Sequence, residues 1–359
     1  MNTNETNDLC GLKREDFQSV VNGKNTDLFI LKNKWGNEVA ITNYGGAIVA
    51  IMVPDRNGNY ANVIQGHDTI QNVVNSEERY LSRLVGRFAN RIKEGKFQLN
   101  GKQYQLPINN GPNALHGGKE GFNAKVWDAL MMNEQTLILN YVSSYGEEGF
   151  TGEVKVTVDY TFNDDNELVI EYLATTNKKT IINLTSHGYF SLAGIANPTP
   201  TVDDLMCEIN ADFYLPIDNT SIPTGEIRLV ENTPFDFRKP KAVGADINAD
   251  HEQIKNGNGY DHCYVLNKKE EGELSFAAKV TEPNSGRTME VYTTEPGMQF
   301  YTKNSAKGTI GHMGQHSPKE VPCALRRNIS PIRLTVRTSP QWCCARVNNT
   351  NKKRFTNLE

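Results

Sequence analysis

Two of the seven histidines stand where an imidazole could exchange a proton with a ligand. His116 lies in the segment Asn-Ala-Leu-His-Gly-Gly, and His187 lies in Asn-Leu-Thr-Ser-His-Gly-Tyr-Phe. Both segments are polar, and the glycine after each histidine lets a ligand approach the backbone. Because an imidazole titrates near neutral pH, the pair is a candidate acid–base site. A structural role is the alternative for any single histidine, and we assign it to the other five: His67, His251, His262, His312 and His316.

Two further segments place hydrogen-bonding side chains among apolar neighbours. Asn90 and Arg91 directly precede Ile92, and Asp261 directly precedes a strand-like run. Guanidinium, amide and carboxylate groups recognise sugar hydroxyls, commonly beside aromatic faces. Taken singly, each of these residues could instead belong to a surface ion pair or a turn.

The elements that must position these residues are β-strands. Short runs rich in β-branched and aromatic residues are separated by Gly, Asn and Asp, as hairpins require. We expect strands over residues 26–31, 38–42, 47–53, 96–99, 103–106, 154–162 and 168–173. No sustained helical period and no internal repeat is evident, so the pattern predicts one large antiparallel β-sandwich.

The composition also indicates the location of the protein and the state of its cysteines. The first eight residues are polar and acidic, unlike a secretion signal, and no apolar run approaches the roughly 18 residues needed to span a bilayer. We therefore expect a cytoplasmic protein without a membrane partner. The six cysteines show no paired metal spacing, and we expect thiols rather than disulfides or a zinc site.

Together, the polar segments resemble the aldose 1-epimerase family. The resemblance runs from about Asp16 to Thr302, and its most specific strings are Asn-Ala-Leu-His-Gly-Gly and Glu-Pro-Gly-Met-Gln-Phe-Tyr-Thr. The segments that match in order and spacing are 86–92, 113–118, 184–194, 259–267 and 295–302. The resemblance implies an all-β fold, a large antiparallel sandwich of the galactose mutarotase type with a sugar cleft on one sheet. This agrees with the strand pattern.

The resemblance also implies roles for individual residues. His187 matches the general acid that protonates the ring oxygen of the sugar, and His116 matches the second histidine beside that oxygen. The positions that match sugar-contacting residues are Asn90, Arg91, Tyr189, Asp261 and Gln299. Ser186 and Gly188, which flank the acid, depart from the Asn and the Ser or Thr that are commoner in the family.

The implied reaction interconverts the α and β anomers of free aldoses such as glucose and galactose. An acid protonates the ring oxygen while a base removes the proton of the C1 hydroxyl, and the open-chain aldehyde then recloses on its other face. Acid and base suffice for this chemistry, so we expect no metal and no other cofactor.

The C-terminal segment differs from the rest of the chain in charge and departs from the family. Residues 303–359 hold 11 of the 38 basic residues but only two of the 42 acidic ones, which leaves 27 basic and 40 acidic residues before it. The family's catalytic base is a glutamate in a Leu-Glu-Thr-Gln-His-Phe-Pro-Asp-Ser-Pro-Asn segment, and that segment is absent. Instead, residues 321–331 read Val-Pro-Cys-Ala-Leu-Arg-Arg-Asn-Ile-Ser-Pro.

A frameshift explains this departure. Codons read from their third base, in a frame entered at Val321, can spell Leu-Cys-Leu-Glu-Thr-Gln-His-Phe-Pro-Asp-Ser-Pro-Asn from Pro322 onward. We therefore predict an epimerase domain over residues 1–302 and a basic tail over 303–359 that is the frameshifted end of the same domain. On this interpretation the tail is no nucleic-acid arm, and neither Glu295 nor Glu320 replaces the base.

Two alternatives remain open at this point. A non-catalytic sugar-binding module would keep the cleft without the base, and a hexose-6-phosphate 1-epimerase would need more basic residues at the sugar rim than Arg91 alone. In each case the expected partner is a small sugar, with no nucleic acid, and the chain is expected to be a monomer or a homodimer.

Overall fold

The computed structural model describes residues 9–197, 202–302 and 304, together with two short strands at 333–334 and 343–344. Its largest sheet has nine strands in the order β12-β13-β14-β15-β26-β24-β23-β18-β21. Their bounds are β12 Asp128–Asn133, β13 Thr136–Ser143, β14 Val154–Phe162, β15 Leu168–Thr176, β26 Arg333–Leu334, β24 Thr288–Thr293, β23 Ser275–Thr281, β18 Met206–Ile209 and β21 Lys241–Ala242. The pairings in this sheet are antiparallel, except that β26 runs parallel to both β15 and β24.

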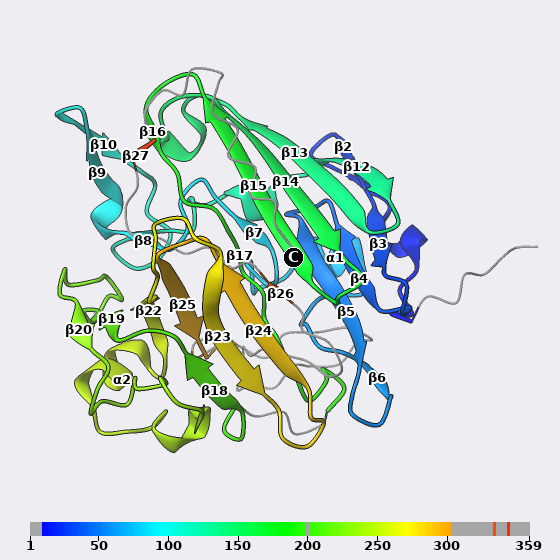
Figure 1. Ribbon diagram of the computed structural model, residues 1–359. Coiled ribbons are helices and arrows are strands. Elements are labelled where there is room, and N and C mark those ends of the chain that lie inside the picture. Colours follow the sequence, from blue (N-terminus) through cyan, green and yellow to red (C-terminus); the bar gives the residue numbers. More distant parts are fainter. Residues whose placement is uncertain (1–8, 198–201, 303, 305–332, 335–342, 345–359) are drawn as a thin grey trace, which may run out of the picture.

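Two four-stranded sheets share one apolar core with this large sheet (Figure 1). One consists of β3 Leu28–Lys32, β4 Glu38–Thr42, β5 Ala47–Pro54 and β6 Tyr60–Asn62. The other, in the order β20-β19-β22-β25, consists of β20 Arg228–Leu229, β19 Phe213–Leu215, β22 Asp261–Val265 and β25 Gly297–Tyr301. Side chains from all three sheets belong to the same buried cluster, so the expected all-β sandwich is confirmed.

The burial of individual strands explains their sequence patterns. In β14 the inward residues Val154, Val156, Val158, Tyr160 and Phe162 are buried and alternate with more exposed ones, as on a sheet with one covered face. In contrast, β4 and most of β5 are buried at successive positions, because one face of these strands packs into the main core and the other into a second apolar cluster. The continuous apolar run at 47–53 reflects this double coverage.

The remaining elements are short. Small two-stranded sheets pair β1 Ser19–Val21 with β2 Lys24–Thr26, β9 Lys96–Leu99 with β10 Lys102–Gln105, β8 Arg91–Ile92 with β11 Ala114–Leu115, β7 Leu84–Val85 with β17 Thr185–Ser186, and β16 Thr180–Ile181 with β27 Cys343–Cys344. The helices are α1 Ile70–Val74 and α2 Glu252–Gly257, with 3-10 turns at Arg14–Phe17, Lys93–Gly95, Phe122–Ala124, Glu147–Gly149 and Val243–Ala245. The strand expected at 26–31 is divided in the structure, where Thr26 ends β2 and β3 begins at Leu28.

Most of the C-terminal segment lies outside the described residues, so the expected frameshift in it stays a prediction.

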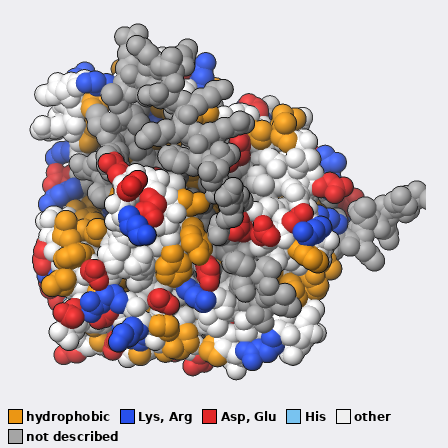
Figure 2. Space-filling view, viewed as in Figure 1, with side chains coloured by type: hydrophobic (Ala, Val, Ile, Leu, Met, Phe, Trp, Pro, Cys, Tyr) orange, Lys and Arg blue, Asp and Glu red, His pale blue; other side chains and the backbone are white. Residues whose placement is uncertain are grey.

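On the face shown in Figure 2, charged side chains of both signs are interspersed with hydrophobic ones. None of the helices in the described part of the chain is long and apolar enough to cross a membrane.

His262 is a structural histidine, as expected from the sequence. It lies on β22 with its side chain in the core, fully buried between the rings of Tyr214 and Phe235. Its Nδ1 accepts a hydrogen bond from the Asp261 backbone N–H at 3.2 Å, which leaves Nε2 protonated toward Gln253 Oε1, also at 3.2 Å. Burial lowers the pKa of His262 to about 3, so the ring is neutral in the folded protein at neutral pH.

Acidification should therefore destabilise the fold through this residue. In the unfolded chain His262 titrates near 6.5, whereas in the folded protein it titrates near 3. Between these values only the unfolded state takes up the proton, so the free energy of unfolding falls with decreasing pH by up to ~1.4 kcal/mol per pH unit. Urea unfolding of His262→Gln and of the parent chain from pH 7 to pH 4 measures this contribution. A constant difference between the two proteins across that range would contradict it.

Candidate active site

The two candidate histidines are brought together by one extended segment, residues 82–92. On one side, the Ser82 N–H donates to His187 O at 3.0 Å and the His187 N–H donates to Arg83 O at 2.8 Å, next to the β7–β17 pair. On the other side, β8 pairs with β11, and the His116 N–H donates to Asn90 O at 3.1 Å. Main-chain hydrogen bonds therefore fix both histidine segments against the same stretch of chain.

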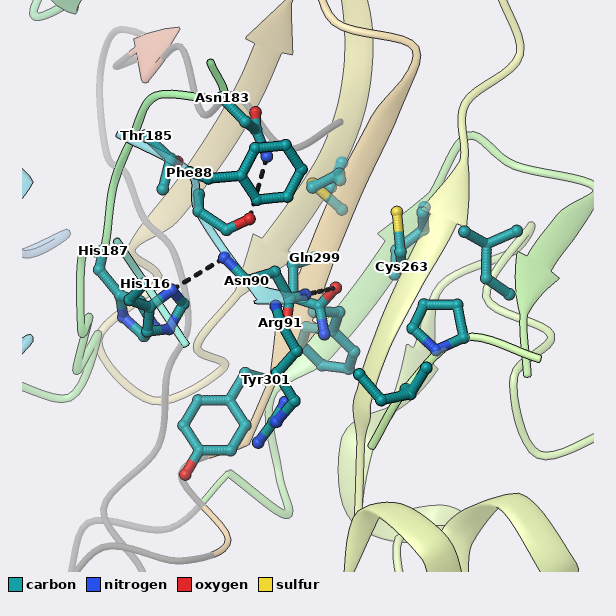
Figure 3. Close-up of a pocket in the computed structure, with 18 of the residues that line it drawn as sticks. Phe88, Asn90, Arg91, His116, Asn183, Thr185, His187, Cys263, Gln299 and Tyr301 are labelled. Carbon is teal, nitrogen blue, oxygen red and sulfur yellow. Dashed lines mark hydrogen bonds between the residues drawn. The ribbon is translucent and has the colours of Figure 1, made fainter. Parts of the chain in front are cut away.

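The imidazoles of His116 and His187 lie in contact at one end of a cavity (Figure 3). Their ring centroids are 5.1 Å apart and the rings are nearly perpendicular, at 86°. Tyr189 stacks on His187 with centroids 4.9 Å apart, and Tyr301 meets the same ring edge-on at 6.4 Å. The contacts of this pair are thus largely aromatic.

A backbone hydrogen bond sets the tautomer of His116. The Asn90 N–H donates to His116 Nδ1 at 2.9 Å, so the neutral ring carries its proton on Nε2. Burial, together with the neighbouring His187 and the charge of Arg91, lowers the pKa of His116 well below its ordinary value. Burial also lowers the pKa of His187, to about 4. Both rings are therefore neutral at neutral pH.

The polar residues beside the histidines form a connected network. Asn90 Nδ2 donates to Gln299 Oε1 at 3.2 Å, and Gln299 Nε2 donates to Asp261 Oδ1 at 2.7 Å. The network continues through Arg91, whose Nη1 lies 3.6 Å from Asp261 Oδ2 and whose Nε donates to Asn110 Oδ1 at 3.0 Å. Burial raises the pKa of Asp261 despite the opposing effect of Arg91.

The cavity that these residues border has a volume of about 570 Å³, which is within the range of small-molecule sites. Of the expected site residues, its lining includes Asn90, Arg91, His116, His187 and Gln299. Tyr189 and Asp261 lie behind the lining. Tyr189 is buried against His187. Asp261 contacts two lining residues, Gln299 and Arg91. The structure thus brings all seven residues together, five at the surface of the cavity and two in support.

Sequence reasoning missed three further residues of this site. Tyr301 lines the cavity from β25, and it could have been found because it stands two positions after Gln299 and hence on the same face of the strand. Lys93 also lines the cavity, two residues after Arg91. Tyr80 contacts both histidine rings from a turn between α1 and β7, and no local sequence signal marks it.

The described residues supply little else that could act as a base. Glu226 is the only carboxylate among the described residues of the lining, and both of its oxygens accept hydrogen bonds from Arg228, at 2.7 Å each. No group of three or more His, Cys, Asp or Glu that could hold a metal ion occurs within the described ranges.

Close backbone packing beside His116 predicts a sharp difference between two glycines. Both Gly117 and Gly101 have positive φ, at +87° and +74°, but a Cβ at Gly117 would meet Gly86 O at 1.9 Å while one at Gly101 would meet nothing within 4 Å. Gly101→Ala should therefore cost only the ~1–2 kcal/mol of the left-handed backbone, and Gly117→Ala clearly more. Urea unfolding of both variants measures the difference, and equal losses would contradict the packing argument.

Comparison with known proteins agrees with this geometry. The family model described as aldose 1-epimerase matches residues 27–338. A galactose mutarotase from Bos taurus is 44% identical over 282 residues, which cover 78% of this chain and 79% of that protein. An aldose 1-epimerase from Escherichia coli strain K12 is 33% identical over 282 residues, covering 79% of this chain and 80% of that protein.

A solved structure shows the same relationship in three dimensions. The crystal structure of an aldose epimerase homologue from C. elegans superimposes with a TM-score of 0.75 at 29% sequence identity, covering 84% of this chain and 88% of that one. The match of fold, together with the extent of the sequence identity, establishes that the chain belongs to the aldose 1-epimerase family.

Proposed function

We propose that this cleft binds a free aldose and is built to interconvert its α and β anomers. The observation that carries the proposal is the contact between the two imidazoles beside a network of amide, guanidinium and carboxylate groups. Ring opening needs a proton at the ring oxygen, and a pair of imidazoles within one cavity can supply and guide it. The relatives named as galactose mutarotases and aldose 1-epimerases support the same reaction.

In this proposal the two histidines have different tasks. His187, in its imidazolium form, delivers the proton to the ring oxygen and becomes neutral. His116, whose Nε2 carries the hydrogen, donates a hydrogen bond to the same oxygen and orients it. Asn90, Arg91 and Gln299 contact sugar hydroxyls directly. Tyr189 supports the His187 ring, and Asp261 orients Gln299 and Arg91 or meets a hydroxyl between them.

The charges of the cavity favour a neutral sugar over a hexose 6-phosphate. A phosphate is usually held by several cationic groups. The described lining contains two basic residues, Arg91 and Lys93, and Arg91 already lies beside Asp261. Lys93 alone, with Glu226 in the same lining, is a poor match for a doubly charged group.

The catalytic base is not among the described residues of the cavity. The family's glutamate has no counterpart among the described residues of the cavity, where Glu226 is engaged by Arg228. We infer that a frameshift has replaced its segment. A sugar-binding protein without catalysis is the second candidate, and this same observation favours it for the chain as written. We further propose a cytoplasmic location and a monomeric or homodimeric state.

Polarimetry on freshly dissolved α-galactose tests the reaction. The chain as written should accelerate mutarotation weakly or not at all. A variant with Leu-Cys-Leu-Glu-Thr-Gln-His-Phe-Pro-Asp-Ser-Pro-Asn in place of residues 322–334, followed by the shifted reading frame, should gain roughly 10²–10⁴-fold. His187→Ala in the restored chain should lose a similar factor.

Three outcomes separate the candidates. A restored chain that binds galactose without accelerating its mutarotation would identify a binding module. Full activity of His187→Ala would remove the assigned acid. Resequencing the codons of Tyr301 to Pro331 shows independently whether the gene encodes the glutamate segment.

Restoring the glutamate should also change the titration of His187. Burial lowers its pKa to about 4, and a carboxylate within ~4–6 Å favours the imidazolium. The pKa of His187 should therefore rise in the restored chain, which increases the fraction of protonated acid at neutral pH. Proton NMR titration of the ring resonances, assigned with His187→Asn, measures the shift. An unchanged or lower value would place the restored carboxylate away from this ring.

A further inference from the structure

Tyr80 lies against both histidines of the site. Its ring meets the His116 ring edge-on, with centroids 4.6 Å apart at 68°, and lies roughly parallel to the His187 ring, at 6.3 Å and 28°. Such aromatic contacts favour particular ring orientations. A single side chain therefore constrains the two imidazoles relative to each other.

The loop that carries His116 is held beside this ring by Asn109, whose side chain lies next to the Tyr80 phenol. Asn109 Nδ2 donates to Leu115 O at 2.9 Å and to Gly118 O at 2.7 Å, while its Oδ1 accepts from the Leu115 N–H at 2.7 Å. Asn109 thus clamps the loop on both sides of His116. Burial raises the pKa of Tyr80, so its hydroxyl stays protonated at neutral pH.

The turn that carries Tyr80 is itself anchored to both halves of the site. The guanidinium of Arg79 donates to Lys119 O, just beyond the His116 loop, and Asn123 Nδ2 donates to Arg79 O at 3.1 Å. Two residues after Tyr80, the Ser82 N–H donates to His187 O. Tyr80 is half-buried and is not part of the cavity lining, so it acts on the histidines from outside the space that a sugar would occupy.

We propose that Tyr80 is a positioning residue that holds His116 and His187 as one unit, through ring contact with both imidazoles. The proposal rests on the assignment of the two histidines to the proposed active site, but it concerns their geometry. It can therefore be tested in the chain as written, whether or not that chain turns over sugar.

The test is ¹⁵N NMR of the full chain labelled at histidine, with the two rings assigned by His116→Asn and His187→Asn. In the parent chain, His116 should show the separated nitrogen shifts of an Nε2–H tautomer. Tyr80→Leu removes the ring, so the ring signals of both histidines should shift or broaden and the His116 nitrogen shifts should converge. Tyr80→Phe keeps the ring and should preserve the signals of both histidines.

Tyr104→Leu is the matched control, because Tyr104 is also half-buried and also stacks on one aromatic ring, Phe97, in the β9–β10 hairpin. It should leave both histidines unchanged. If Tyr80→Leu does not fold, Tyr80→Met serves instead, because it also removes the ring, and it should alter the signals of both histidines. Unchanged imidazole signals in the folded variant would overturn the proposal.

A second readout applies to the frame-restored chain if it is active. There Tyr80→Leu should lower kcat about 10–100-fold while KM changes much less, since misplaced catalytic groups cost rate more than binding. Recovery of most of this activity in Tyr80→Phe is expected. Equal loss in both variants would assign the effect to the hydroxyl and contradict the role of the ring.

Discussion

The geometry of the site depends on the main chain of residues 82–92. This segment hydrogen-bonds to the His187 strand on one side and to the His116 loop on the other, and its packing leaves no room for additional atoms. A Cβ at Gly86 would meet the Phe122 ring at 2.3 Å, and one at Gly117 would meet Gly86 O at 1.9 Å. Because backbone contacts set these distances, the main-chain positions of the two histidines are fixed, and side-chain contacts then orient their rings.

The polar side chains of the cleft are partners of one another. Asn90 donates to Gln299, Gln299 donates to Asp261, and Asp261 lies beside Arg91. A sugar must exchange some of these bonds for bonds to its hydroxyls, so the net gain per contact is modest. The compensation is that the side chains are already ordered, and little conformational entropy remains to be lost on binding.

Much of the fold and of this site could be predicted from the sequence, because their signals are local or periodic. The alternation along β14 identifies a strand with one buried face, and the chemistry of the His116 and His187 segments is visible in short strings of residues. The double burial of β5 could not be read from its apolar run, which fits a buried helix segment equally well. Tyr80 was missed because its contacts with both histidines are tertiary, between segments more than 30 residues apart.

The charges of the cleft affect the rate at which a sugar associates with it. With both imidazoles neutral and Arg91 placed beside Asp261, the site presents a weak field to a substrate that itself carries no charge. Long-range steering accelerates association only where opposite charges face each other, and its signature is a steep dependence on ionic strength. Sugar capture by this protein is therefore governed by diffusion and by the shape of the opening, and it should proceed at the same rate in dilute and in concentrated salt.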